Sequence, residues 1–317
     1  MRQLPFTSGT ETNQSNPSSY PVLVDTDIGD DIDDAFALAL ALRSPEIALL
    51  GVTTVFGDTR LRAQLAQRLL HTFGQTAIPV AAGVGTPLLY RHPPSSIPQA
   101  SVLKERTPCE PISDLSGPEL IIQTALAHQQ QLILLCFGPL TNIATALTRE
   151  PRLFMAIQRI IMMGGSSSYP FPEWNVRSDA RAARVVLASG IPITLIGWNV
   201  TTRCQLRKQD IKQLQLNGSP QTDLLCQLLS IWQEQRPRWH SALPYIHDAL
   251  AVAALCQPDL FQFQDMAVSV QLHGPLKGFM VTRLLNGPLV NAAVGIQVDA
   301  VRTWIMRRLL ALSPQDA

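Results

Sequence analysis

Charge is scarce in this sequence. Lys, Arg, Asp and Glu together make up only 15% of its 317 residues, and the formal net charge is +1. A globally basic field for binding nucleic acid is therefore absent. Hydrophobic residues make up 46% of the chain, which excludes a disordered, solvated protein. A chain of this length buries roughly three quarters of its surface on folding, so its core needs neither disulfides nor a structural metal.

Long apolar runs and paired cysteines are also missing. No run approaches the ~18 residues of a membrane-spanning helix, so we expect no membrane partner. Residues 1–20 are polar and lack the apolar centre of a secretory signal, so we interpret them as a flexible leader and residues 21–317 as one domain. The five cysteines are widely spaced and form no CxxC motif. They predict reduced thiols in a cytoplasmic protein.

Short apolar segments alternate with helix-like segments along most of the chain. The expected strands are 21–25, 47–55, 78–82, 132–137, 160–163 and 193–196. The expected helices are 33–43, 61–73, 119–129, 140–148, 179–189 and 301–312. Continuously apolar strands that alternate with helices indicate a parallel sheet covered on both faces. The fold class is therefore α/β, a single domain with a Rossmann-like, mostly parallel central sheet flanked by helices.

Two regions depart from this alternation. Residues 83–117 form a long, Pro-rich and weakly periodic segment, a length that is typical of functional loops. Residues 208–257 are mainly helix-like and predict a helical elaboration after residue 200. Two late apolar segments, 266–271 and 279–283, are expected to pair as a hairpin.

The most informative segment is an acidic loop between the first expected strand and helix. Six of the 24 acidic residues fall within the ten residues from Asp25 to Asp34. In a parallel sheet this junction lies at the carboxyl edge, where ligands bind. A helix N-terminus supplies only about half a positive charge, so the mutual repulsion favours a hard divalent cation such as Ca²⁺ or Mg²⁺. The alternatives are a solvated turn in which Asp33 caps the helix, or a metal-free carboxyl with a raised pKa.

Two better-known acidic motifs fit this loop poorly. An EF-hand loop needs Gly at its sixth position, whereas Gly29 is fifth and follows a strand. Haloacid-dehalogenase phosphatases also begin with a strand and DxD, but here Ile28-Gly29 and four more acids follow. The phosphatase hypothesis would predict phosphate release from phosphomonoesters with a preference for Mg²⁺.

Four later segments extend the pattern in a fixed order. They are GVTTV at 51–55, GPLTN at 138–142, MGG at 163–165 followed by EWN at 173–175, and HDA at 247–249. With the strand, the DxDxG and DDA parts of the acidic loop and the helix that follows, they resemble the inosine-uridine preferring nucleoside hydrolase family. The resemblance runs from about residue 21 to beyond residue 280.

The resemblance implies a role for each matching residue. The implied Ca²⁺ ligands are Asp27, Asp34, the main-chain carbonyl of Thr141, and Asp248. It further implies Asp33 as the general base, Glu173 and Asn175 as ribose-binding residues, and His247 as the group that protonates the leaving base. Asp25 would support the site from behind, and Asp31 would lie close enough to reach it.

The sequence departs from the family pattern at several places. Two residues are inserted between Gly29 and Asp33, and we align the motif across this gap because an ungapped alignment puts Ile32 at a ligand position. Asp58 stands where many members have Asn near the sugar, and Ser167 stands where the family has another Asn. We keep both as substrate-binding candidates, although an ionised carboxylate can only accept hydrogen bonds.

Together these patterns predict a Ca²⁺-dependent hydrolase that cleaves the N-glycosidic bond of ribonucleosides to free nucleobase and ribose. The expected setting is cytoplasmic nucleoside salvage by a homodimer or homotetramer, with a small nucleoside as the partner and no nucleic acid. The alternatives are a hydrolase of another N-riboside and a non-catalytic nucleoside- or ribose-binding relative. The preference for purine or pyrimidine bases stays open.

Overall fold

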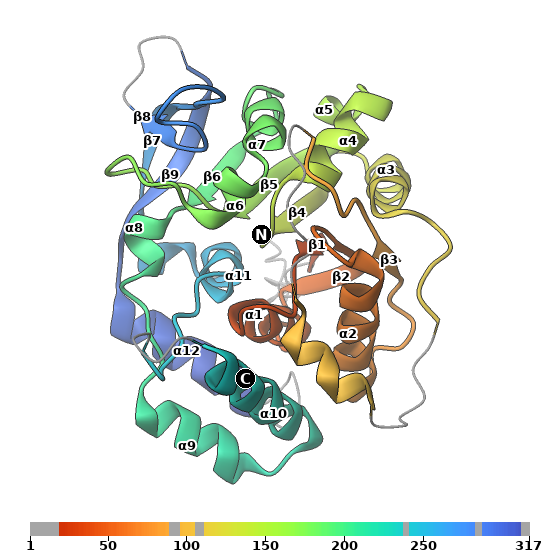
Figure 1. Cartoon of the computed structure of the whole chain (residues 1–317), viewed down its shortest axis with the longest axis vertical. Helices are drawn as coiled ribbons and strands as arrows, with labels where there is room; N and C mark the ends of the chain where they lie inside the picture. The colour runs from red at the N-terminus through yellow and green to blue at the C-terminus, as the bar shows by residue number, and fades with distance from the viewer. Residues whose placement is uncertain (1–18, 89–95, 105–110, 237–240, 283–286, 312–317) are drawn as a thin grey trace, which may run out of the picture.

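The computed structural model describes residues 19–88, 96–104, 111–236, 241–282 and 287–311. Its strands are β1 (Tyr20–Thr26), β2 (Ile47–Thr54), β3 (Val80–Ala82), β4 (Leu132–Cys136), β5 (Ile157–Met163), β6 (Ile193–Ile196), β7 (Phe261–Val270), β8 (Met280–Thr282) and β9 (Leu289–Ile296). They form one sheet of nine strands in the order β3-β2-β1-β4-β5-β6-β9-β7-β8. Figure 1 shows this sheet crossing the molecule, with β1 near its middle.

The α-helices are α1 (Asp33–Leu42), α2 (Thr59–Thr72), α3 (Gly117–Ala127), α4 (Thr141–Arg149), α5 (Leu153–Ala156), α6 (Trp174–Ser178), α7 (Ala180–Leu187), α8 (Trp198–Thr201), α9 (Lys208–Asn217), α10 (Pro220–Gln235), α11 (Ala249–Cys256) and α12 (Val298–Leu310). Two 3₁₀ helices, η1 (Pro98–Lys104) and η2 (Pro258–Leu260), complete the described elements. Among the described residues no helix is both long and apolar enough to cross a lipid bilayer.

The predicted mostly parallel sheet is confirmed. Every neighbouring pair from β3 through β6 to β9 is parallel, and only β7, which is antiparallel to both β9 and β8, runs the other way. The predicted hairpin is also present, since β8 pairs antiparallel with β7. The sequence did not predict β9, which lies between β6 and β7 and joins the parallel and antiparallel parts. Its burial alternates along LVNAAVGI, and its small residues give a weak strand signal.

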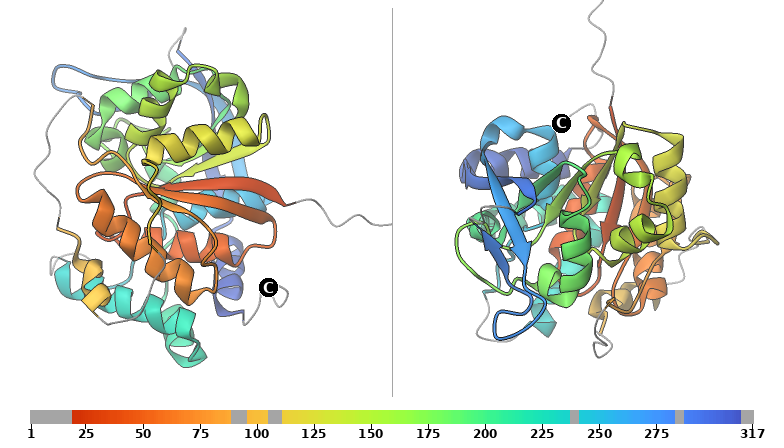
Figure 2. Two further views of the ribbon diagram at one scale, coloured as in Figure 1. Left: turned by 90° about the vertical axis from the view of Figure 1, so that its right-hand side faces the viewer. Right: turned by 90° about the horizontal axis from the view of Figure 1, so that it is seen from above.

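Each face of the sheet carries its own apolar core. In β1, Val22 and Val24 face the core that holds α1, α2, α10, α11 and α12, whereas Leu23 faces the core that holds α3, α4 and α7. Helices cover both sides of the sheet in Figure 2. This double burial explains why the strands read as continuous apolar runs.

The helical elaboration after residue 200 is confirmed, with α9, α10 and α11 packed on the α1 side of the sheet. All residues of α11 except its last are buried, and this helix packs against α1. Several boundaries differ from prediction: α2 begins at Thr59 because Asp58 caps it, and β5 begins three residues earlier than expected. The predicted loop at 83–117 contains one short helix that the sequence did not predict, η1. Residues 89–95 and 105–110 of this segment lie outside the described part.

Candidate active site

A cavity of about 620 Å³ opens where β1, β4 and β5 end and where α1 and α11 begin. This is the carboxyl edge of the parallel strands, the position that the acidic loop predicted. Its lining residues are Asp27, Asp30, Asp31, Asp33, Asp34, Phe137, Met163, Glu173, Trp174, Asn175, Trp198, Trp232, Ser241, Leu243, Tyr245, His247 and Asp248. The cavity therefore has an acidic side and an aromatic side.

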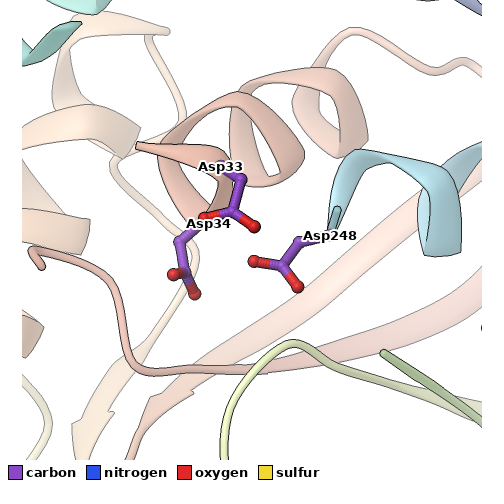
Figure 3. Close-up of side chains that lie close together, drawn as sticks. All are labelled: Asp33, Asp34 and Asp248. Carbon is purple, nitrogen blue, oxygen red and sulfur yellow. The ribbon is translucent and has the colours of Figure 1, made fainter. Parts of the chain in front are cut away.

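Three carboxylates meet on the acidic side. Asp33 and Asp34 open α1, Asp248 immediately precedes α11, and oxygens of all three lie within 4.8 Å of one another. Figure 3 shows the three side chains pointing toward one another from these two helix starts. Because α1 and α11 pack side by side, residues more than 200 positions apart meet at one point.

This cluster is electrostatically costly without a cation. Removal from water raises the pKa values of Asp33, Asp34 and Asp248 well above their usual range, and the charges of neighbouring aspartates raise them further. Asp27 follows the same pattern, with burial as the main cause and Asp34 as the next. Oδ1 of Asp248 is buried and has no hydrogen-bond partner among the described residues. A hard divalent cation would remove both costs, so the donor set fits one.

Asp25 lies behind this cluster and does not line the cavity. Its Oδ1 accepts hydrogen bonds from Thr53 Oγ1 at 2.6 Å and from Asn142 Nδ2 at 2.7 Å. Asn142 also donates to the carbonyl of Thr54. Burial raises the pKa of Asp25 to about 7, against the lowering effect of both hydrogen bonds. The residue thus ties the end of β1 to β2 and to the start of α4.

Glu173 and Asn175 form the wall next to the acidic side. The Glu173 carboxylate caps α6 and accepts hydrogen bonds from the backbone N–H groups of Gly165, Asn175 and Val176 at 2.7–3.1 Å. Burial raises its pKa, and these three bonds counter the rise. Asn175 Nδ2 donates to the carbonyl of Phe137 at 2.6 Å. Both side chains are therefore held rigidly at the cavity surface.

The aromatic side is a ladder of stacked rings. Phe171 stacks on Trp198 with ring centres 4.9 Å apart, and Trp198 stacks on His247 at 5.1 Å. Tyr245 tilts against His247 at 5.6 Å. Nδ1 of His247 is 2.7 Å from Thr201 Oγ1, and burial lowers the pKa of His247 to about 4. The imidazole is therefore neutral at neutral pH, with Nε2 as the ring nitrogen not engaged by Thr201.

The structure gathers most of the predicted site residues but not all. Asp27, Asp31, Asp33, Asp34, Glu173, Asn175, His247 and Asp248 line the cavity. Asp58 is exposed and caps α2, and Ser167 is buried against Asn199 and the carbonyl of Ala293. Thr141 donates its hydroxyl to Asp179 rather than lining the cavity. Trp239 and His240, which precede Tyr245 in the sequence, lie outside the described residues.

Arg62 is a residue of this region that the sequence did not single out. Its side chain is fully buried on α2, beneath the acidic loop. The signal was present, because Arg62 shares helical spacing with the buried Leu65, Ala66 and Leu69. A charged residue on the apolar face of a helix needs a buried partner. Phe137 was also missed; it lines the cavity one residue after β4.

Comparison with known proteins identifies the same family as the sequence motifs. The sequence model of the family described as inosine-uridine preferring nucleoside hydrolase matches residues 22–304. The chain is 33% identical over 309 residues to the pyrimidine-specific ribonucleoside hydrolase RihA of Enterobacter sp. strain 638, covering 89% of this chain and 94% of that protein. It is 31% identical over 299 residues to RihA of Escherichia coli O9:H4, with the same coverage.

Solved structures share the same architecture. A plant nucleoside hydrolase, PpNRh1, superposes with a TM-score of 0.83 at 25% identity over 92% of this chain and 99% of its own. The purine-preferring ribonucleoside hydrolase from Gardnerella vaginalis has a TM-score of 0.81 at 24% identity, over 92% of this chain and 98% of its own. At this level of identity the second likeness concerns the fold alone.

Proposed function

The chain belongs to the inosine-uridine preferring nucleoside hydrolase family, whose members hydrolyse ribonucleosides to base and ribose, and we propose that it does so with Ca²⁺ and an aspartate base. The observation that carries the proposal is the convergence of Asp33, Asp34 and Asp248 in one buried cluster. Oxygen-only ligands in a flexible, multi-carboxylate arrangement favour Ca²⁺ over softer metals.

The residues proposed to hold the cation are Asp27, Asp34 and Asp248. The sequence-based proposal adds the main-chain carbonyl of Thr141, but Thr141 lies within α4 and does not line the cavity, and its carbonyl accepts a hydrogen bond from Thr145 Oγ1. The backbone next to Phe137 is better situated, because a Cβ on Gly138 would lie 2.9 Å from Asp27 Oδ1. A carbonyl oxygen has two lone pairs, so Phe137 could accept from Asn175 and still serve as the main-chain ligand in place of Thr141.

When bound, the cation supplies positive charge that keeps the surrounding carboxylates ionised and orients the sugar hydroxyls and a water. Glu173 and Asn175, fixed by their backbone contacts, would hold the ribose. Asp33 would accept a proton from the attacking water as the N-glycosidic bond breaks through an oxocarbenium-like state. Asp27 is the competing base, because the charge of Arg62 opposes the burial-driven rise in its pKa.

His247 is the proposed partner of the leaving base. At neutral pH its ring is uncharged, so it would act as a neutral hydrogen-bond donor through Nε2, with Thr201 Oγ1 donating to Nδ1. Replacing His247 with Ala should slow ribonucleoside hydrolysis roughly a hundredfold. The same variant should hydrolyse 4-nitrophenyl riboside at a rate close to wild type, because a stable phenolate needs no proton to leave. Equal losses on both substrates would mean that His247 does not serve the leaving group.

Pyrimidine ribonucleosides are the proposed preferred substrates. Support comes from the relatives that share 31–33% identity over most of both chains, which are named as pyrimidine-specific. The experiment measures ribose release from uridine, cytidine, inosine, adenosine and guanosine, before and after chelation and with Ca²⁺ restored. Ribose release that ignores chelation would contradict the metal, and tight nucleoside binding without ribose release would favour the non-catalytic alternative.

Two isosteric variants test which aspartate is the general base. Asp33→Asn should abolish turnover while Ca²⁺ still binds, because Asp33 is not among the proposed ligands. Asp27→Asn should weaken Ca²⁺ binding as well. If Asp33→Asn keeps near-normal turnover and Asp27→Asn has none even at saturating Ca²⁺, the base is Asp27.

The proposed setting is cytoplasmic nucleoside salvage by a homodimer or homotetramer. The four described cysteines form no disulfide, which agrees with a reducing compartment. The low content of charged residues agrees with a subunit interface. Sedimentation of the purified protein measures the oligomeric state directly.

A further inference from the structure

The guanidinium of Arg62 donates hydrogen bonds to the backbone of the acidic loop and to the backbone that follows β2. Its Nε donates to the carbonyl of Phe56 at 2.7 Å. Nη1 donates to the carbonyl of Asp27 and, at 2.9 Å, to that of Ile28. Nη2 forms an ion pair with Asp30 Oδ2 at 2.8 Å. One fully buried side chain thus fixes two consecutive carbonyls of the loop and one of its carboxylates.

Gln99 holds the next part of the same loop. Its backbone N–H donates to the carbonyl of Gly29 at 3.2 Å, and its Nε2 donates to the carbonyl of Asp31 at 2.8 Å. Gln99 is fully buried in η1, and Gly29 has φ +125°, with space for no Cβ because Ile97 Cγ2 would lie 2.4 Å from it. The carbonyls of residues 27, 28, 29 and 31 are therefore all bound by donors outside the loop.

These contacts separate the two surfaces of the loop. Its carbonyls are turned toward Arg62 and Gln99, whereas the side chains of Asp27 and Asp31 line the cavity, and Asp30 both borders the cavity and pairs with Arg62. Without such ties, a loop that carries three aspartates and leads into two more at the start of α1 would relieve its repulsion by spreading apart. The arrangement keeps the acidic side of the cavity assembled before any cation arrives.

We propose that Arg62 is a positioning residue for the cation site, and that it acts through the planar fork that binds the backbone of the acidic loop. The proposal rests on the cation binding proposed above. A lysine has the same charge but cannot reproduce the fork, since its ammonium is a single point donor. The proposal therefore predicts that geometry, and not charge alone, sets the affinity of the site for Ca²⁺.

The test compares two charge-conserving substitutions. Arg62→Lys removes the fork beneath the loop, and Arg43→Lys makes the same change at another buried arginine, one that follows the far end of α1. Calorimetric titration of Ca²⁺ into chelator-treated protein gives the dissociation constant of each variant. The titration is run at a temperature well below the melting temperature of either variant. Substitution of a residue that supports a metal ligand typically lowers metal affinity by about 10–100-fold. We therefore expect the dissociation constant to rise at least tenfold for Arg62→Lys and to change less than twofold for Arg43→Lys.

Further measurements distinguish a positioning role of Arg62 from general destabilisation of the protein. Ribose release by Arg62→Lys should recover when Ca²⁺ saturates the variant, which a merely structural defect would not allow. An unchanged dissociation constant for Arg62→Lys, or an equal loss in Arg43→Lys, would overturn the proposal. If Arg62→Lys does not fold, Gln99→Leu removes a donor to the same loop without a change of charge, and it should weaken Ca²⁺ binding about threefold; unaltered binding there would overturn it too. If the wild-type protein itself binds no Ca²⁺, the proposed function fails instead.

Discussion

The acidic side of the cavity draws its carboxylates from two short stretches, the loop between β1 and α1 and the residue before α11. The aromatic side draws on α8, α10 and the segment 241–247, which come together only in the folded chain. The acidic side is fixed by buried hydrogen bonds to backbone, as at Arg62 and Gln99. The aromatic side is held mainly by ring stacking, as between Trp198 and His247.

This difference indicates that the two sides of the cavity have different roles. Charges that must bind a cation and water need fixed positions, because electrostatic interactions in a buried site change steeply with distance. A surface that receives a flat, apolar base tolerates more adjustment, since stacking contributes only about 0.5–1.5 kcal/mol per ring pair beyond burial. Substitutions of the carboxylates on the acidic side should therefore abolish the reaction, whereas those on the aromatic side, apart from His247 with its proposed role at the leaving group, should change affinity for the base.

The largest effect should come from Asp34→Asn. The amide keeps the shape of the carboxylate and its contact with Thr26 Oγ1, but it removes one negative charge from the cluster. We expect Ca²⁺ binding to be lost by calorimetry and ribose release to fall about a thousandfold, or about 4 kcal/mol of transition-state stabilisation. Without metal, the variant should melt at the same temperature as wild type or higher, because a buried like charge is gone. Retained turnover would mean that the acidic side is not the centre of the reaction.

Chelation should also make stability depend on pH in a defined direction. Asp25 has its pKa raised to about 7, and burial also raises the pKa values of Asp33, Asp34 and Asp248 well above their usual range. The folded state then binds more protons than the unfolded state, so the free energy of unfolding falls as pH rises through these values. The lowered pKa of His247 acts oppositely, but only below its unfolded value of about 6.5.

Thermal melts at pH 6.5 and 8 measure this dependence. The chelated protein should melt at a lower temperature at pH 8, and added Ca²⁺ should raise the melting temperature more at pH 8 than at pH 6.5. A chelated protein that becomes more stable across this range would contradict the buried repulsion on which the acidic side depends.

The sequence made the acidic side predictable for a physical reason. Six carboxylates in ten residues at a strand end have few stable arrangements, and the carboxyl edge of a parallel sheet then places all but Asp25 in a cleft. Asp248 joined them through a motif near the other end of the chain. Most strands and helices were equally readable, because burial on both faces produces continuous apolar segments.

The remaining features depend on tertiary contacts that leave little local trace. Strand β9 is rich in small residues and half-exposed, so its pairing between β6 and β7 comes from its neighbours. Trp198 lies in a four-residue helix, and its place in the ring ladder depends on His247, 49 positions along the chain. Thr141 and Ser167 are polar residues near site motifs, yet both bind other parts of the fold.

On the aromatic side we expect a moderate effect from Trp232→Leu. Trp232 lines the cavity from α10 and takes no part in the stack on His247. Loss of one stacking partner should raise KM roughly 3–10-fold and leave kcat within about twofold. Steady-state kinetics with the best ribonucleoside measures both. Trp304→Leu on α12, outside the cavity lining, is the matched control and should leave KM unchanged. A large fall in kcat for Trp232→Leu would remove the proposed distinction between the two sides.

The smallest effect should come from Asp58→Asn, which tests where the acidic side ends. Asp58 is exposed, and its Oδ1 accepts a hydrogen bond from Leu61 N at 3.0 Å, which caps the helix that carries Arg62. Asn is an equally good cap, so KM and kcat should stay within about twofold of wild type, whereas Asp58→Ala should cost about 1 kcal/mol of stability in chemical denaturation. If Asp58→Asn raises KM more than fivefold, this carboxylate reaches the sugar after all. The acidic side would then extend beyond the loop that Arg62 holds, to the residues that follow β2.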